Sequence, residues 1–504
     1  MVAGILASID AVGIAVGLGA QQFRFVVCLL SCYPLGIIHK MLPTTKGNEI
    51  KHLFATVVGL MQAYACFETD IIHFIISTLA TYIIMAALPK QCGWIAFVYN
   101  MAHLTWGNYD RMVNDYLGYS LNWTVPQMIL LCKLTSIAWN YQDGHTPDAV
   151  LEKRDRDGFQ RSHALKTLPS PLEMFSYAFF FAGFLSGPWS DFTEYKAFVD
   201  RSMFKEEEDG NIPAPTKFVL WKFLAVGIAL IGYVGGDSFD INWLTTQEFA
   251  SYPWIARVGW YILHTEIFYF KYYVVWWLGE GATAVIGLSY NGRDANGETK
   301  WDRIRMLDLW RYKFAQSIVK DAVPSWNMMS QHWLRRYVHQ RFMSLGFSHT
   351  ASRVTTFVTS ALWHGLYPGY FIFFGMGAMF GEGTHFMYHT MIPYFYDENG
   401  RGIYPRKYLF DIGTTATIWV FIDYMAPTFQ LLAFSHGIFA LNQIYWFCHI
   451  AFVGSIVLWG IHKVLFPDHL KIAKERAAKI AQIEKEEAAK AAAAARPVPK
   501  IKKE

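Results

Sequence analysis

Apolar runs that approach twenty residues recur along nearly the whole 504-residue chain. A helix needs about twenty apolar residues to cross the hydrocarbon core of a bilayer. Hydrophobic residues make up 53% of the chain and charged residues only 17%, which argues against a series of soluble domains. Membrane barrels carry short alternating segments instead. The sequence therefore predicts an all-α, polytopic membrane protein with about eleven transmembrane or re-entrant helices.

The apolar runs end near residue 466, which divides the chain into two predicted parts. Residues 1–466 form a membrane-embedded domain, and residues 467–504 form a charged Ala/Lys/Glu-rich tail that is solvated and at most partly helical. The excess of Lys and Arg in this tail predicts that it lies on the cytosolic side. Lys500 and Lys502 resemble a dilysine retrieval signal, which predicts a multi-pass protein of the endoplasmic reticulum membrane.

One histidine lies inside an almost uncharged, aromatic-rich run. His364 belongs to the stretch Ser360-Ala-Leu-Trp-His-Gly-Leu-Tyr-Pro-Gly-Tyr370, within the apolar region 354–380. An ionisable side chain at membrane depth is costly, so it is by default a candidate for function. A core histidine that bonds to a neighbouring helix is the alternative, and position alone leaves both open.

A second unusual stretch, residues 310–342, alternates basic and aromatic side chains. It contains Asn327, for which a helix-capping role is the alternative to a functional one. Arg335, Arg336 and Arg341 fit either of two interpretations. They contact the phosphates of a nucleotide-like substrate, or they extend to lipid headgroups at the membrane surface.

These two stretches together carry a family resemblance. Pro324-Ser-Trp-Asn-Met-Met-Ser-Gln-His-Trp-Leu-Arg-Arg-Tyr-Val338, followed by residues 360–370, resembles the membrane-bound O-acyltransferase family, and in particular its lysophospholipid acyltransferase branch. Residues 139–144 (Trp-Asn-Tyr-Gln-Asp-Gly), residues 168–173 (Leu-Pro-Ser-Pro-Leu-Glu) and residues 185–195 look like the same branch. The likeness covers roughly residues 125–390.

The resemblance implies a helical membrane fold around an internal tunnel. Acyl-CoA would enter from the cytosol as a co-substrate, a lysophospholipid would arrive from the bilayer, and neither a cofactor nor a metal would be needed. The family's catalytic pair carries over to His364 and Asn327. Histidine titrates near neutrality and suits the removal of a hydroxyl proton. The asparagine amide either stabilises the developing oxyanion or orients the imidazole. Ser360 is interpreted as packing rather than as a nucleophile.

The resulting hypothesis is an acyl-CoA-dependent enzyme that reacylates lysophospholipids in membrane lipid remodelling. Its headgroup and acyl-chain preferences and its oligomeric state stay open, no nucleic-acid partner is expected, and a sterol, diacylglycerol or protein hydroxyl is the alternative acceptor. The predicted substrate-binding residues are Trp326, Trp333, Arg336, Trp363 and Tyr370.

Two other classes of membrane protein were weighed. Glu382, His385 and His389 have the spacing of metal ligands on one helix face, which suggests a di-iron oxidase. Such an enzyme needs more histidine clusters than this chain supplies, so the oxidase is the less favoured hypothesis. A transporter would show internal repeats and ion-paired carboxylates within its spans. The sequence shows no repeat, and its acidic residues are expected to cluster in the loops.

Overall fold

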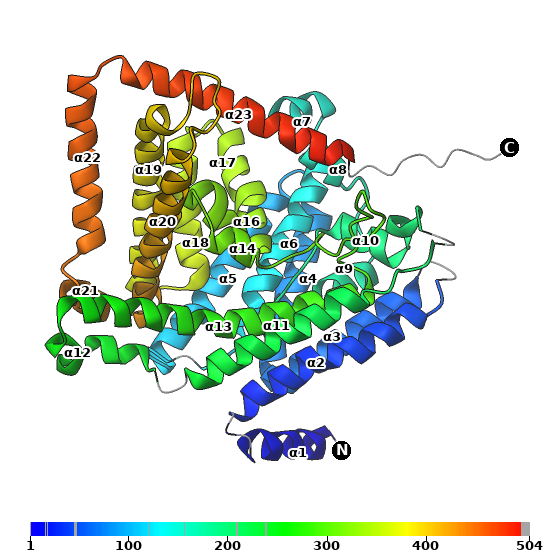
Figure 1. Cartoon of the computed structure of the whole chain (residues 1–504). Coiled ribbons are helices and arrows are strands. Elements are labelled where there is room, and N and C mark those ends of the chain that lie inside the picture. The colour runs from blue at the N-terminus through cyan, green and yellow to red at the C-terminus, as the bar shows by residue number, and fades with distance from the viewer. Residues whose placement is uncertain are drawn as a thin grey trace.

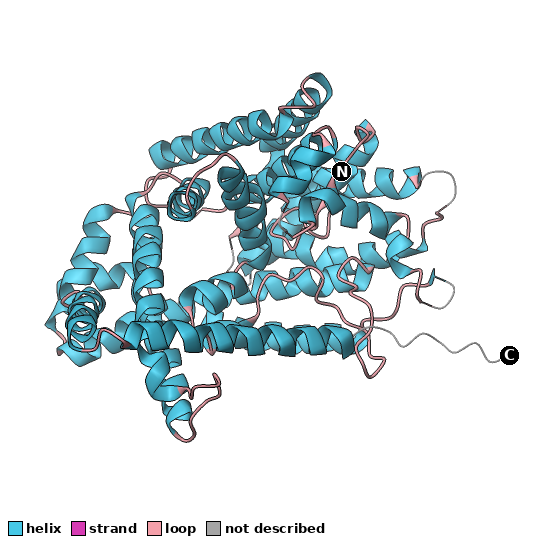
Figure 2. Ribbon diagram, turned by 90° about the horizontal axis from the view of Figure 1, so that it is seen from above, coloured by secondary structure: helices cyan, strands magenta, loops and turns pink. Residues whose placement is uncertain are grey.

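The computed structural model describes residues 2–15, 17, 19–44, 48–118, 120–155, 157–207, 210–236 and 239–494. Within these ranges the regular structure is helical, and extended pairing is limited to three isolated bridges, Arg293 with Thr299, Leu307 with Trp326 and Tyr396 with Gly402. Figure 2 accordingly shows helices joined by loops. The predicted all-α fold class is confirmed for this part of the chain.

The N-terminal half supplies the elements α1 (Val2–Ala15), α2 (Ala20–Met41), α3 (Glu49–Phe67), η1 (Glu68–Asp70), α4 (Ile71–Ala87), α5 (Cys92–Asn114), α6 (Thr124–Gly144), α7 (Asp148–Arg154), α8 (Phe159–His163), α9 (Pro171–Ala178), α10 (Phe192–Val199) and η2 (Ser202–Phe204). The rest of the chain supplies α11 (Thr216–Gly235), η4 (Ile241–Thr245), α12 (Gln247–Ser251), α13 (Trp254–Ile286), α14 (Leu309–Lys313), η5 (Ile318–Ala322), α15 (Val323–Ser325), α16 (Met328–Trp333), η6 (Leu334–His339), α17 (Gln340–Ser344), α18 (His349–His364), α19 (Pro368–Phe395), α20 (Arg406–Leu431), α21 (Phe434–Gln443), α22 (Phe447–Leu465) and α23 (His469–Ala494).

Helix α6 lies at the centre of the molecule. Every residue from 129 to 143 is buried, and α4, α5 and α16 pack around it (Figure 1). A helix that is buried on all sides belongs to the interior of a large bundle. The apolar run at residues 125–141, which is short for a membrane span, is therefore enclosed by protein, so its length does not have to match the thickness of the bilayer.

Four helical stretches are long and apolar enough to cross a membrane, by length and composition: Ala20–Met41, Glu49–Ala87, Thr216–Gly235 and Phe447–Leu465. The last of these, α22, stands at the edge of the molecule in Figure 1 and exposes large apolar side chains, among them Ile450, Leu458 and Val464. An exposed apolar face of this size suits contact with lipid.

The predicted count of about eleven spans is not confirmed, because other long helices carry charges that are paired inside the protein. Helix α13 has 33 residues, and its Glu280 and Glu266 bond to Lys222 and Lys313. Pairing reduces the free-energy cost of placing these charges inside the bundle. The charged residues nevertheless lower the mean hydropathy of the helix.

The C-terminal helix α23 crosses the top of the molecule in Figure 1 and packs against α19. Arg476 Nη1 donates to the carbonyl oxygen of Pro393 at 2.8 Å, and Ile480 is buried against Ile392 and Tyr396. The sequence predicts a solvated tail here, and the side of α23 that packs against α19 is not predicted. The domain boundary at residue 466 stays a prediction, and Lys500 and Lys502 lie outside the described residues.

Candidate active site

The imidazole of His364 is enclosed by aromatic rings at the C-terminal end of α18. The centroid of its ring lies 4.8 Å from that of Trp363, 5.7 Å from Tyr370, 5.4 Å from Phe374 and 4.9 Å from Phe429. No hydrogen bond joins its ring nitrogens to the described part of the chain. The core-histidine alternative requires such a bond, so the geometry favours a histidine that is available to substrate.

Two glycines shape this end of the site. Gly365 has φ +141°, a conformation that side chains other than glycine's rarely adopt, and it ends α18 directly after His364. Gly369 lets α19 approach the end of α20, because its N–H donates to the carbonyl oxygen of Leu432 at 2.8 Å and a Cβ would lie 2.3 Å from the carbonyl oxygen of Thr428. This close approach brings Phe429 against His364.

Asn327 lies in the turn between α15 and α16 with left-handed backbone angles, φ 44° and ψ 55°. Asparagine tolerates this conformation better than most residues. Its side chain does not cap α16, and its buried Oδ1 has no hydrogen-bond partner. The capping alternative is therefore not realised, and the carboxamide is available for another role. The buried hydroxyls of Ser325 and Ser330, close to Asn327 in sequence, also have no hydrogen-bond partner. They add unused hydrogen-bonding groups around this turn.

A buried ion pair holds the backbone around Asn327. Glu280 bonds to Lys222, and its Oε1 accepts from the N–H of Met306 at 2.7 Å and of Leu307 at 3.2 Å. The carbonyl oxygen of Met306 in turn accepts from the N–H of Met328 at 2.8 Å. The carboxylate on α13 thus fixes the segment against which residues 326–328 are aligned. The sequence signal for Glu280 is a carboxylate in an apolar helix, one of two in α13 beside Glu266.

One aromatic contact joins the segment that carries Asn327 to the segment that carries His364. Trp333 and Trp363 have ring centroids 6.2 Å apart. Trp326, the neighbour of Asn327, packs 5.7 Å from Tyr272 on α13. His364 and Asn327 do not bond to each other. Trp326, Trp333 and Trp363, hereafter the aromatic wall, lie close to the two groups in sequence, and the meeting of His364 with Asn327 stays a prediction.

Trp333 is fully buried, and its Nε1 donates to Thr135 at 2.9 Å. Trp363 Nε1 donates to the carbonyl oxygen of Met128 at 3.1 Å. Trp326 is packed by α13 residues Tyr269 and Trp276, each 4.9 Å away. These contacts account for the three tryptophans as parts of the wall. Their direct contact with substrate stays a prediction.

The basic residues have different surroundings. Arg341 is buried and bonds to both carboxylate oxygens of Asp143 at 2.7 Å, so neither of its two predicted roles, phosphate contact or extension to headgroups, is correct. Arg336 bonds to Asp157 and lies 4.2 Å from the ring of Phe159. Arg335 is exposed.

Two other segments that resemble the family, residues 139–144 and 185–195, meet at α16 and η6. Tyr337 donates to Asn140 at 3.0 Å and to Asp191 at 2.7 Å, and His332 Nε2 lies 3.5 Å from Asp191. In the segment 168–173, Ser170 and Glu173 form a capping box at the start of α9, in which each side chain accepts from the backbone N–H of the other residue. These segments, far apart in the sequence, anchor the helices that follow Asn327.

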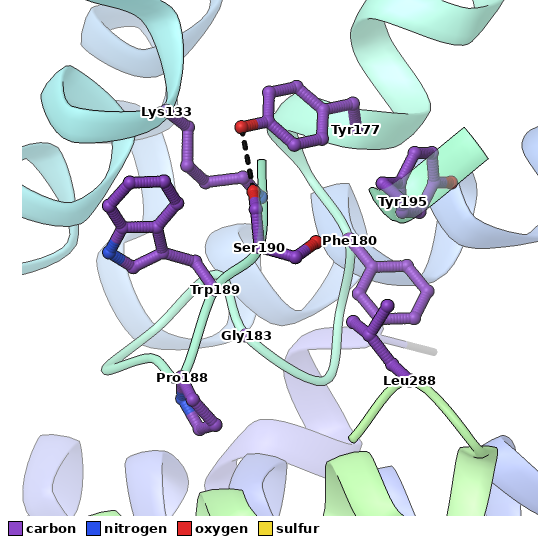
Figure 3. A pocket seen from close by; sticks show the side chains of 9 residues that line it. All are labelled: Lys133, Tyr177, Phe180, Gly183, Pro188, Trp189, Ser190, Tyr195 and Leu288. Atoms are coloured by element: carbon purple, nitrogen blue, oxygen red, sulfur yellow. Dashed lines mark hydrogen bonds between the residues drawn. The ribbon is translucent and has the colours of Figure 1, made fainter. Parts of the chain in front are cut away.

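Two cavities in the described part of the chain are lined by other residues. A water-sized cavity lies beside Lys133 on α6, where Tyr177 donates to the carbonyl oxygen of Ser190 (Figure 3). A larger cavity of about 510 Å³ lies beside η4 and α13. Neither is lined by His364 or Asn327, and the internal tunnel stays a prediction.

Among the described side chains, no group of three or more His, Cys, Asp or Glu lies close enough together to hold a metal ion. The side chains of His385 and His389, on which the oxidase hypothesis rests, lie outside the described set.

Comparison with known proteins identifies the family. Residues 112–427 match the model of MBOAT, the membrane-bound O-acyltransferase family. The chain is 30% identical over 460 residues to a lysophospholipid acyltransferase of Schizosaccharomyces pombe, covering 88% of this chain and 87% of the relative. It is 29% identical over 466 residues to membrane-bound glycerophospholipid O-acyltransferase 2 of Gallus gallus, covering 89% and 87%. It is 24% identical over 485 residues to lysophospholipid acyltransferase 5 of Homo sapiens, covering 93% and 94%. The chain belongs to the membrane-bound O-acyltransferase family.

Proposed function

We propose that this protein transfers an acyl group from acyl-CoA to the free hydroxyl of a lysophospholipid. The observation that supports the proposal is a histidine without a hydrogen-bond partner and an asparagine with an unpartnered amide oxygen, on two segments that the Trp333–Trp363 contact joins. The relatives named lysophospholipid acyltransferase align over most of the chain and support the acceptor class.

In the proposed mechanism, His364 accepts the proton of the lysophospholipid hydroxyl while the oxygen attacks the thioester carbon. General base catalysis of this kind contributes about 10²- to 10⁴-fold. The carboxamide of Asn327 donates to the thioester oxygen as negative charge develops there, a contribution of about 10²- to 10³-fold for one donor. The C–S bond then breaks, the protonated imidazole of His364 returns its proton to the departing sulfur, CoA leaves as the thiol, and the phospholipid carries the new ester.

The surrounding rings keep bulk water from the attacking hydroxyl and so favour transfer over hydrolysis. We further propose that an internal tunnel delivers the two substrates to this point, and that the enzyme resides in the endoplasmic reticulum membrane.

The test is an acyl-transfer assay on membranes that contain the full-length protein, with a panel of lysophospholipids and, separately, a sterol, a diacylglycerol and a protein acceptor. His364→Ala should lose at least about 100-fold in turnover. The matched control is His349→Ala, because His349 is exposed at the other end of α18. Turnover with a non-phospholipid acceptor alone would overturn the assignment.

A further inference from the structure

A cavity of about 510 Å³ is lined by none of the candidate active-site residues. It forms where η4 and α12 meet the first turns of α13, at the lower left of Figure 1. Its lining residues are Phe239, Asp240, Asn242, Trp243, Thr246, Tyr252, Trp260 and His264. Its volume falls within the range of small-molecule sites, roughly 300–1,000 Å³.

The rings of this cavity meet at steep angles around Trp243. The ring of Trp260 lies 5.7 Å from it at 79°, and that of Tyr252 lies 5.8 Å from it at 68°. His264 is buried and stacks on Trp243 at 5.7 Å, so it forms the floor. These rings line one cavity, and the negative face of an aromatic ring attracts a cation.

The charge of the lining residues also favours a cation. Asp240 is exposed at the mouth, and its Oδ1 accepts from the backbone and side-chain nitrogens of Asn242. Neither lysine nor arginine is among the described lining residues. The cavity can therefore attract a positive group but offers no cation to an anion.

The position of the cavity, close to the end of a candidate membrane span, indicates which kind of cation it binds. Residue 239 follows closely after Gly235, the last residue of the candidate span Thr216–Gly235. The end of a span lies near the level of the phospholipid headgroups. A quaternary ammonium sheds water more easily than a primary ammonium and is the cation that aromatic cages recognise.

We infer that this cavity, hereafter the aromatic cavity, binds the trimethylammonium headgroup of a choline phospholipid or lysophospholipid at the membrane boundary. The ammonium group lies against Trp243 and Trp260, and its charge is balanced by Asp240. The phosphate stays outside, toward solvent. This site does not depend on which residues catalyse acyl transfer.

The first test is saturation-transfer NMR on the full-length protein in nanodiscs made of phosphatidylglycerol, which contains no quaternary ammonium. Phosphocholine is the probe, and its N-methyl protons should receive saturation from the protein. Asp240→Asn should weaken binding about threefold to tenfold, and Trp243→Leu about tenfold or more. Asn at position 240 keeps the acceptor for Asn242, so this variant tests charge with the turn intact.

Two control variants separate the aromatic cavity from general surface effects. Glu248→Gln removes an exposed carboxylate on α12, and Trp310→Leu removes a tryptophan that is 74% exposed on α14; neither residue lines the cavity. Both should bind phosphocholine as the unmodified protein does. Equal binding of phosphoethanolamine and phosphocholine, or unchanged binding by the Asp240 and Trp243 variants, would overturn the site and leave only an aromatic belt at the membrane surface.

The second test identifies the source of the headgroup. The same protein in phosphatidylcholine nanodiscs should give a weaker phosphocholine signal, because a membrane lipid already occupies the cavity. An undiminished signal would overturn the assignment to a lipid headgroup. Both experiments also run on His364→Ala, so failure of the site and failure of the catalytic proposal give different results.

Discussion

At the scale of single residues, the proposed site depends on two side chains whose hydrogen-bonding capacity the protein leaves unused. The sequence pointed to His364 as an ionisable side chain in an apolar run, and to Asn327 through the family resemblance of the segment that carries it. It could not point to Phe374 or Phe429, which are ordinary apolar residues brought to His364 by folding. Nor could it separate Arg341 from Arg336, since burial against Asp143 depends on α6, about 200 residues earlier.

The backbone and side-chain roles of Asn327 can be separated by two substitutions. Asn327→Gly suits φ 44° but removes the amide, so the protein should accumulate normally and lose about 100-fold or more in turnover. Asn327→Ala should also lose activity and should in addition be less stable by about 1 kcal/mol, because alanine disfavours this conformation. Thermal unfolding of the purified variants and turnover measured side by side check this. An active glycine variant would contradict the catalytic role.

At the scale of elements, hydropathy predicted a helical membrane protein, and the described residues include four stretches long and apolar enough to cross a membrane, residues 447–465 among them. It predicted poorly where helices are buried by protein. The interior helix α6 appeared as a short span, and the left-handed turn at Asn327 gave no local signal. Burial within a bundle is set by partners distant in sequence, which periodicity in one segment does not record.

The contact between α19 and α20 can be tested with two glycines on the same helix. A methyl group at Gly369 would meet the carbonyl oxygen of Thr428 at 2.3 Å and displace Phe429 from His364. Gly369→Ala should therefore lower turnover at least tenfold and destabilise the protein by about 1–3 kcal/mol. Gly375→Ala is the control, because nothing lies within 4 Å of its added methyl group. Equal effects of the two variants in assay and unfolding would refute this account.

The pair between α11 and α13 gives a second test at this scale. Glu280→Gln leaves Lys222 buried without its partner and should cost about 3–5 kcal/mol of unfolding free energy. The double variant Glu280→Gln with Lys222→Met removes both charges and should recover most of that loss, while glutamine still accepts from Met306. Denaturation of the unmodified protein, of Glu280→Gln, of Lys222→Met and of the double variant gives the coupling energy. Simple additivity of the two single losses would show that the charges do not act as a pair.

At the scale of the whole molecule, family membership and the helical fold class are established, and the tunnel, the orientation and the compartment stay predictions. The sequence predicts retrieval to the endoplasmic reticulum through Lys500 and Lys502. Replacing both lysines by serine should move part of the protein to later secretory membranes, without changing turnover in isolated membranes. Replacing Lys485 and Lys490 removes the same charge from α23 and is the control. Unchanged distribution by fractionation would argue against the signal.

The central claim is that His364 and Asn327 act together in one transfer step, and a double-mutant cycle tests it most directly. Initial rates of phospholipid formation from acyl-CoA and lysophospholipid are measured for the unmodified protein, the two alanine variants and the double variant. Each single variant should lose about 100-fold or more, and the double variant should be no more than a fewfold slower than the worse single one, because groups that act as a unit are not additive. Losses that multiply, or a near-normal rate in either single variant, would contradict the claim.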